Sequence, residues 1–152
     1  MNRVNKIIEN EEYIDLIKRI DEQEKERIYC KHGYSHLMDV ARMMYIEALE
    51  KGLDIDREVI YAAALLHDIG RAVSNENHDS ESAKLAVHIL ELAEFNREEI
   101  ACIVEAIESH RTGSNTELGK LLYKNDKLSR ACYFCKAQDT CKWKTLNKRI
   151  YR

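Results

Sequence analysis

A histidine–aspartate pair, His67-Asp68, closes an apolar run over residues 61–66. Burying such groups beside an apolar segment is unfavourable unless they are paired or bound to something. A divalent metal ion is a suitable partner, because imidazole and carboxylate ligands together suit zinc, iron and manganese. The pair therefore predicts a metal centre whose other ligands come from elsewhere in the chain.

Four more residues have positions that suit the same centre. His110 lies three and seven residues after two isoleucines, and Asp126 lies four and eight residues after two leucines. Both therefore continue apolar helix faces. His36 falls in the first turn of a predicted helix, and His78 stands just ahead of another. Since buried carboxylates are rare unless paired or metal-bound, these residues predict one shared site.

Two further histidines are interpreted differently. His88 lies between Val87 and Ile89, off the apolar face of its segment, and we assign it no role. His32 lies beside Gly33 in a predicted loop, where it is a candidate substrate contact.

The segments that must position these residues have the apolar spacing of amphipathic helices. Proline is absent and the five glycines lie near predicted helix ends, as an all-helical chain requires. Capping residues such as Asp56 and the Asn96–Glu99 pair mark helix starts. The six main predicted helices run over 11–27, 35–50 and 56–67 and begin near 79 or 80, near 96, and at 115 or 116. Their predicted inward positions include Ile14, Ile17, Ile20, Val40, Met44 and Leu49.

The composition predicts one all-α domain in a chain of 152 residues. No run of about 18 apolar residues could cross a membrane, and the first residues lead into no signal-peptide core, so we expect a cytoplasmic protein. Residues 120–152 carry ten Lys or Arg against two acids, although the net charge is −3. This basic block is typical of a segment that binds an anion, or of a solvated helix face and tail.

The order of the candidate ligands resembles the HD superfamily of metal-dependent phosphohydrolases. The local sequences that carry the resemblance are Tyr34-Ser35-His36, Leu65-Leu66-His67-Asp68-Ile69-Gly70-Arg71, Ser109-His110-Arg111-Thr112-Gly113 and Asn125-Asp126-Lys127-Leu128-Ser129-Arg130. The resemblance implies an HD-domain helical bundle over residues 30–130, preceded by a helical segment, 1–29, and followed by a basic, cysteine-containing tail, 131–152.

The resemblance also implies ligand roles. His36, His67, Asp68 and Asp126 match the superfamily's four-residue metal site. His78 and His110 match the extra histidines of the dinuclear branch, in which the equivalent of Asp68 bridges both ions. That branch includes bacterial diadenosine tetraphosphate hydrolases, although only nine residues separate Asp68 from His78, fewer than those enzymes lead us to expect. The Gly-Tyr-Pro signature of cyclic-di-GMP phosphodiesterases is absent.

Two ions at such a centre would acidify a water and neutralise phosphoryl oxygens, which predicts a phosphohydrolase with Asp68 and His67 as catalytic residues. The mixed ligands favour iron, with manganese, zinc, nickel or cobalt as alternatives. Basic residues close to the motifs are candidates for binding a phosphate chain, namely Arg71, Arg111, Lys127 and Arg130.

A second group of residues could also bind a metal. Cys132, Cys135 and Cys141 form a C-x2-C-x5-C pattern, which resembles the three-cysteine part of some iron–sulfur sites. The alternatives are a zinc site or a tail with free thiols. A fourth ligand is missing locally; Cys30 or Cys102 would supply it only if the fold brings one near, and Cys102 reads as a core residue beside Ile103.

Three functional hypotheses follow. The first is hydrolysis of a phosphomonoester or phosphoanhydride in a small phosphorylated substrate, a nucleotide by preference over nucleic acid. The second is a di-iron oxygenase on the HD fold, since some such oxygenases use the same six-ligand pattern. The third is a metal- or nucleotide-binding sensor module without turnover. The oligomeric state stays open, with a homodimer as one alternative.

Overall fold

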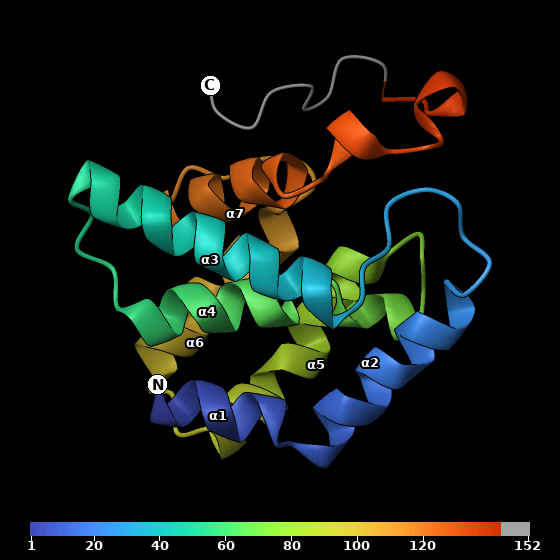
Figure 1. Cartoon of the computed structure of the whole chain (residues 1–152). Helices are drawn as coiled ribbons and strands as arrows, with labels where there is room; N and C mark the ends of the chain where they lie inside the picture. The colour runs from blue at the N-terminus through green and yellow to red at the C-terminus, as the bar shows by residue number, and fades with distance from the viewer. Residues whose placement is uncertain (144–152) are drawn as a thin grey trace.

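The computed structural model describes residues 1–143, and the regular elements within them are all helical (Figure 1). The all-α prediction is therefore confirmed. The α-helices are α1 (Asn2–Ile8), α2 (Glu11–Gln23), α3 (Tyr34–Lys51), α4 (Arg57–Leu66), α5 (His78–Leu92), α6 (Arg97–Ser109) and α7 (Glu117–Leu128). Short 3-10 helices are η1 (Ile69–Ala72), η2 (Cys132–Phe134) and η3 (Gln138–Thr140).

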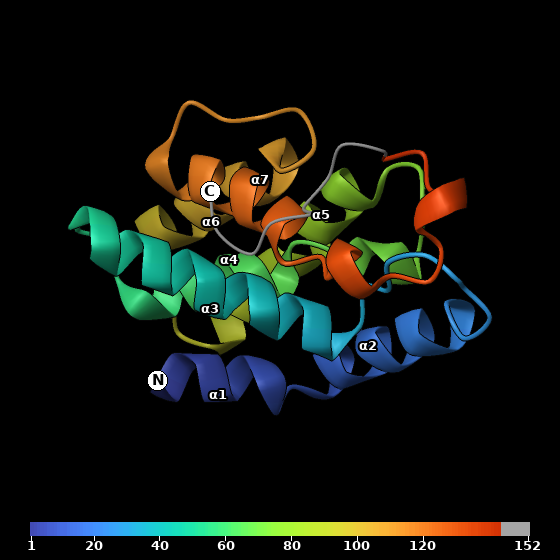
Figure 2. The ribbon, with the colours of Figure 1, turned by 45° about the horizontal axis from the view of Figure 1, so that its top comes forward.

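The helix α4 forms the centre of the bundle, because nearly every side chain from Val59 to Leu66 is buried. It packs against α3, α6 and α7, while α5 packs against α6 and η1. Figures 1 and 2 show α1 and α2 along one side of this core and α7 along the other. Burial of apolar side chains from all seven α-helices in one cluster stabilises this arrangement.

Side-chain caps fix several helix ends, as the sequence predicts. Asn96 and Glu99 form a reciprocal capping box at the start of α6, and Asp56 accepts hydrogen bonds from the first amides of α4. Thr116 caps α7. At the end of α3, Gly52 adopts a left-handed conformation with φ 63°, which glycine reaches without a Cβ clash.

Several sequence predictions about burial and helix ends are wrong. Ile14 is 37% exposed, because Tyr13, Leu16, Ile17 and Ile20 form the buried face of α2. Leu49 is 62% exposed, since Ala48 faces the core in that last turn of α3.

Helix lengths and one cysteine also differ from expectation. Cys102 is exposed on α6, since the inward position beside it belongs to Ile103. The helix α2 ends at Gln23 rather than near Arg27, and α5 begins at His78 itself. The seven-residue α1 was not predicted, because its two buried side chains are too few to show a period.

The C-terminal region is described only in part. Residues 131–143 form two 3-10 turns joined by irregular chain, and residues 144–152 of the predicted tail lie outside the described residues. Among helices of the described range, none is both long and apolar enough to span a membrane.

Candidate metal centre

The six predicted ligands all stand at or near helix ends that meet at one place. His67 ends α4, Asp68 precedes η1, and His110 ends α6. His78 begins α5, while the other two ligands, His36 and Asp126, lie in the first turn of α3 and the last turn of α7. Five of the six are buried, and His36 is half-buried. The fold thus brings together residues that are up to 90 positions apart in the sequence.

One group of ligand atoms comes from His36, His67, Asp68 and Asp126, and these atoms all lie within 4.8 Å of one another. His36 Nε2 lies 3.4 Å from Asp126 Oδ1 and 3.8 Å from Asp68 Oδ2. His67 Nε2 lies 3.3 Å from Asp68 Oδ2 and 3.8 Å from Asp126 Oδ1. Two imidazoles and two carboxylates at this spacing suit a first-row transition metal.

A second group consists of Asp68, His78 and His110. Here the other carboxylate oxygen of Asp68 is used, because Oδ1 lies 3.2 Å from His78 Nε2 and 3.7 Å from His110 Nε2. Asp68 therefore belongs to both groups and presents a different oxygen to each.

The four histidines are oriented by their other ring nitrogen. The Nδ1 atoms of His67, His78 and His110 lie 2.7, 3.0 and 2.6 Å from the carbonyl oxygens of Ala64, Asn75 and Ile107. His36 Nδ1 lies 3.3 Å from Ser129 Oγ. A ring that donates from Nδ1 keeps the lone pair of Nε2 available for a metal, which is the arrangement that metal-binding histidines need.

Several buried atoms that face the centre have no hydrogen-bond partner within the described residues. They are His36 Nε2, His67 Nε2, Asp68 Oδ1 and Asp126 Oδ1. Buried polar atoms are normally satisfied, so this concentration of unsatisfied donors and acceptors at one place needs an explanation. The residues present fit a metal ion, because the same atoms are the ones whose spacing suits a ligand set.

The charges at the centre interact strongly. Burial opposes ionisation of Asp68, but the neighbouring His67, His110 and Arg71 hold its pKa well below the usual value. Burial likewise opposes ionisation of Asp126, whose pKa is nonetheless lowered by hydrogen bonds from His36 and His67. The two carboxylates raise the pKa of His67 to about 10 against its burial. The centre therefore attracts positive charge, either a proton or a cation.

A guanidinium group belongs to the second ligand group. Arg71 Nε lies 2.8 Å from Asp68 Oδ1, and Arg71 Nη2 lies 3.1 Å from His78 Nε2. Burial and the Arg71 charge lower the pKa of His78 to about 4, although Asp68 opposes this shift. An ion held by His78 and His110 would share these contacts with Arg71, so its binding requires this side chain to move.

Each ligand group is braced by a contact outside it. Asn125 Nδ2 donates to Glu47 Oε2 over 2.9 Å, which ties α7 to α3 beside Asp126. On the other side, Gly70 N donates to Ser82 Oγ over 2.8 Å, which ties η1 to α5. A Cβ on Gly70 would collide with the backbone of His78 and Ser82, so only glycine allows this close approach.

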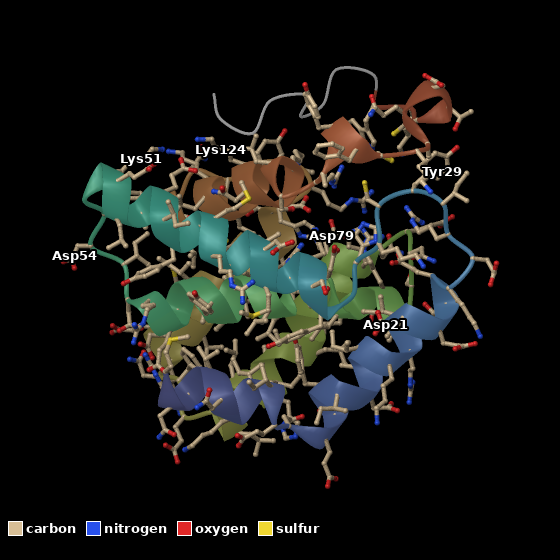
Figure 3. The ribbon with its side chains drawn as sticks, in the orientation of Figure 1. Asp21, Tyr29, Lys51, Asp54, Asp79 and Lys124 are labelled. Atoms are coloured by element: carbon tan, nitrogen blue, oxygen red, sulfur yellow. The ribbon has the colours of Figure 1, made fainter. Side chains whose placement is uncertain are left out.

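The centre opens into a cavity of about 700 Å³. Its lining includes His78, His110 and Asp126 and all four predicted phosphate-binding residues, Arg71, Arg111, Lys127 and Arg130. Arg130 lies 3.5 Å from Asp126 Oδ2, and Lys127 lies 3.7 Å from the same oxygen. Arg111 instead binds the carbonyl of Glu76 and the carboxylate of Asp79, a position that Figure 3 marks.

The cavity also has residues that the motifs do not contain. Arg27, Tyr29, Asn75, Lys142 and Trp143 line it, since the loop before α3 and the segment after η3 both reach over the centre. No periodicity or motif marks such loop positions. The excess of basic residues after position 120 was the one available signal, and it applies to Lys142 alone.

The two remaining histidines have different surroundings. His32 lines the cavity, but its Nδ1 lies 2.7 Å from Glu24 Oε1 and its ring contacts His36 edge-on. It therefore positions the loop before α3 and stays a candidate substrate contact. His88 is exposed on α5, away from the centre, in agreement with the absence of an assigned role.

The fold and the ligand groups define an all-helical protein with a histidine–aspartate centre suited to metal. The chain belongs to the HD domain family, whose pattern it matches over residues 33–141. This family consists in general of metal-dependent phosphohydrolases that bind divalent ions. The narrower resemblance to diadenosine tetraphosphate hydrolases stays a prediction.

Several curated proteins are similar to this chain. An uncharacterized protein of Clostridium beijerinckii is 40% identical over 146 residues, which cover 94% of this chain and 93% of that protein. Ribonuclease Y of Mycoplasma mycoides is 31% identical over 112 residues, or 72% of this chain and 24% of that enzyme. Ribonuclease Y 1 of Pediococcus pentosaceus is 36% identical over 99 residues, or 65% and 18%. No solved structure gives a significant match.

Proposed function

We propose that the protein is a phosphohydrolase whose centre holds two divalent ions. His36, His67 and Asp126 would bind one ion, His78 and His110 would bind the other, and Asp68 would bridge them. The observation that carries this proposal is the position of the Asp68 carboxylate, which presents Oδ2 to the first group and Oδ1 to the second. Iron is the favoured metal, because the ligands mix imidazole and carboxylate.

The side chains of the protein divide the work around such ions. Bound divalent ions acidify water and neutralise phosphoryl oxygens in an in-line displacement. The carbonyl contacts of the histidine Nδ1 atoms keep the ligand geometry fixed, so the centre does not have to reorganise during the reaction. Arg130 and Lys127 stand beside Asp126 at the cavity wall, where they can bind phosphate oxygens that reach the centre.

The cavity favours a nucleotide as the substrate. Its volume of about 700 Å³ is in the usual range for sites that bind small molecules. The lining combines basic groups, which suit a phosphate chain, with the rings of Tyr29 and Trp143, on which a base can stack. Arg130 lies 5.9 Å from the Trp143 ring, so the aromatic and cationic parts of the cavity are adjacent.

The test combines metal analysis with a substrate screen. Protein purified without oxygen is assayed for bound metals and then for phosphate release from nucleoside mono-, di- and triphosphates and dinucleoside polyphosphates, with each metal added in turn. Metal-dependent release from any of these supports the proposal. Oxygen-dependent turnover would instead indicate the di-iron oxygenase, and nucleotide binding without turnover would indicate the sensor module.

A second candidate is hydrolysis of a phosphodiester bond in RNA. It is favoured by the similarity to two ribonucleases Y over most of this chain, although the chain spans a quarter or less of each enzyme. The basic block after residue 120 suits a polyanion as well as a nucleotide. Cleavage of a labelled single-stranded oligoribonucleotide, with no phosphate release from nucleotides, would favour this candidate.

A further inference from the structure

The loop before α3 and the turns after α7 lie side by side. Figures 1 and 2 both show the loop over residues 24–33 next to the segment that contains η2 and η3. The Tyr29 hydroxyl lies 3.3 Å from Thr140 Oγ1 and 3.4 Å from the Thr140 carbonyl oxygen, and Figure 3 marks Tyr29 facing those turns. The contact joins the residue next to Cys30 with the residue next to Cys141.

Four cysteines meet where these two segments touch. Cys30 and Cys141 line the same cavity. Burial raises the pKa of the Cys132 thiol, and charges on Cys30, Cys135 and Cys141 raise it further, an influence that requires all four side chains to be close together. The remaining cysteine, Cys102, is exposed on α6 and takes no part in this group.

The spacing of the sulfur atoms bears on what they can bind. All five cysteines are free of disulfide bonds. Within the described residues, sets of three or more ligand atoms that lie within 4.8 Å of one another come only from the histidine–aspartate centre, so no three sulfurs are that close. The sulfurs around a tetrahedral zinc, at a Zn–S distance of about 2.3 Å, are about 3.8 Å apart. The cysteines therefore leave room for a larger group than one zinc ion.

We propose that Cys30, Cys132, Cys135 and Cys141 are the four thiolate ligands of a [4Fe–4S] cluster. Each thiol releases its proton when its sulfur binds iron, so four protons leave the protein on assembly. The C-x2-C-x5-C pattern supplies three ligands from one short segment, and the loop before α3 supplies the fourth. Arg130, whose charge favours the thiolate of Cys132, offsets part of the negative charge.

Such a cluster would join two walls of the substrate cavity. The loop that carries Cys30 leads directly into α3 with His36, and the segment that carries Cys132 follows α7 with Asp126. Between them lie the cavity residues Arg130 and Trp143. The cluster is thus placed to hold the cavity wall rather than to take part in hydrolysis, because its ligands are absent from both ligand groups of the histidine–aspartate centre.

The test uses the whole protein, purified without oxygen, and measures iron, zinc and acid-labile sulfide. Sulfide is the informative quantity, because the histidine–aspartate centre can bind iron but contains no inorganic sulfide. We expect the wild-type protein to contain about four sulfides per chain and to show the broad visible absorbance of an iron–sulfur cluster. The Cys30→Ser variant should lose most of the sulfide and absorbance, whereas the control Cys102→Ser should keep both. Equal sulfide in the two variants would overturn the role of Cys30.

A second measurement keeps the test decisive if Cys30→Ser does not fold. Wild-type protein is treated with iodoacetamide before and after removal of metal by a chelator, and the labelled cysteines are identified by mass spectrometry. We expect label on Cys102 alone before removal and on all five cysteines afterwards. Labelling of all five cysteines before removal overturns the proposal. Protected cysteines with one bound zinc and no sulfide would also overturn it, in favour of a zinc site.

Discussion

The two ligand groups of the histidine–aspartate centre share Asp68 but differ in what surrounds them. The first has four ligand residues and no guanidinium among its contacts to Asp68 Oδ2. The second has three, and Arg71 contacts both Asp68 Oδ1 and His78 Nε2. A cation in the first group meets two carboxylates, whereas one in the second meets a single shared carboxylate and a competing positive charge.

This difference teaches that the two ions should not be equivalent. The first group is expected to hold its ion tightly and to behave as part of the fold. The second is expected to exchange its ion with solvent, because the ion must displace Arg71 from atoms that Arg71 already satisfies. Activity that depends on both ions would then follow the occupancy of the second group.

The largest effect is expected from Asp68→Asn, which removes charge from both groups at once. We expect both ions to be lost and turnover to fall by about 10³-fold or more, because charge stabilisation at the centre disappears. Metal analysis and phosphate release measure these effects. Asp54→Asn, at an exposed loop far from the centre (Figure 3), is the matched control. Metal content and activity equal to those of the control would refute the shared role of Asp68.

Replacing one histidine in each group tests the inequality directly. His78→Ala should remove about one ion per chain and leave the other in place, because the first group keeps all its ligands. His36→Ala should leave neither ion tightly bound, because the second group has only three ligands and the competing Arg71. Both are measured as metal-to-protein ratios after dialysis. Equal ratios in the two variants would show that the ions are equivalent.

Arg71→Gln should strengthen the second group, since it removes a positive charge 2.8 Å from Asp68. We expect the affinity for the second ion to rise about tenfold, while the first ion is little affected. Calorimetric titration with manganese measures both. The control is Arg111→Gln, because that guanidinium contacts Glu76 and Asp79 instead of the ligand atoms. Unchanged or weaker binding in Arg71→Gln alone would show that the guanidinium supports the second ion.

Much of this centre was predictable, and the unpredicted parts have a common physical origin. The spacing of apolar residues placed His110 and Asp126 on inward faces, and the structure confirms that both are buried. The position of Arg71 next to its motif suggested a substrate contact, but not its approach to Asp68 and His78, which depends on how η1 meets α5. Contacts made by loops between distant elements leave no period in the sequence.

The same reasoning applies to the residue that braces the first group. Glu47 lies on α3 at a position that a pattern assigns to no role, yet it is 8% exposed. It accepts hydrogen bonds from Lys124 Nζ and Asn125 Nδ2 over 2.8 and 2.9 Å. Figure 3 shows Lys51 and Lys124 reaching toward this place from α3 and α7. Its role became visible only when the two helices were placed side by side.

The smallest effect is expected from Glu47→Gln. Burial would raise the pKa of Glu47, but hydrogen bonds from Lys124, Lys51 and Asn125 lower it to about 2, from an ordinary value of 4.5. A pKa that is lower in the folded state stabilises the fold above about pH 4.5, and this contribution is lost as the pH falls toward 2. We therefore expect the variant to lose about 1 kcal/mol of unfolding free energy at pH 7 and progressively less below pH 4.5.

Urea unfolding of the metal-free protein across this pH range measures that loss, with Glu50→Gln, an exposed position one turn further along α3, as the control. Because Asn125 precedes Asp126, the same variant should weaken the first ion by no more than a few-fold and leave the second unchanged. A stability difference that does not shrink below pH 4.5 would mean that Glu47 acts through packing rather than through its charge. Weakening of the second ion instead would mean that the two groups are coupled beyond their shared Asp68, since Glu47 contacts only the side of the centre formed by α3 and α7.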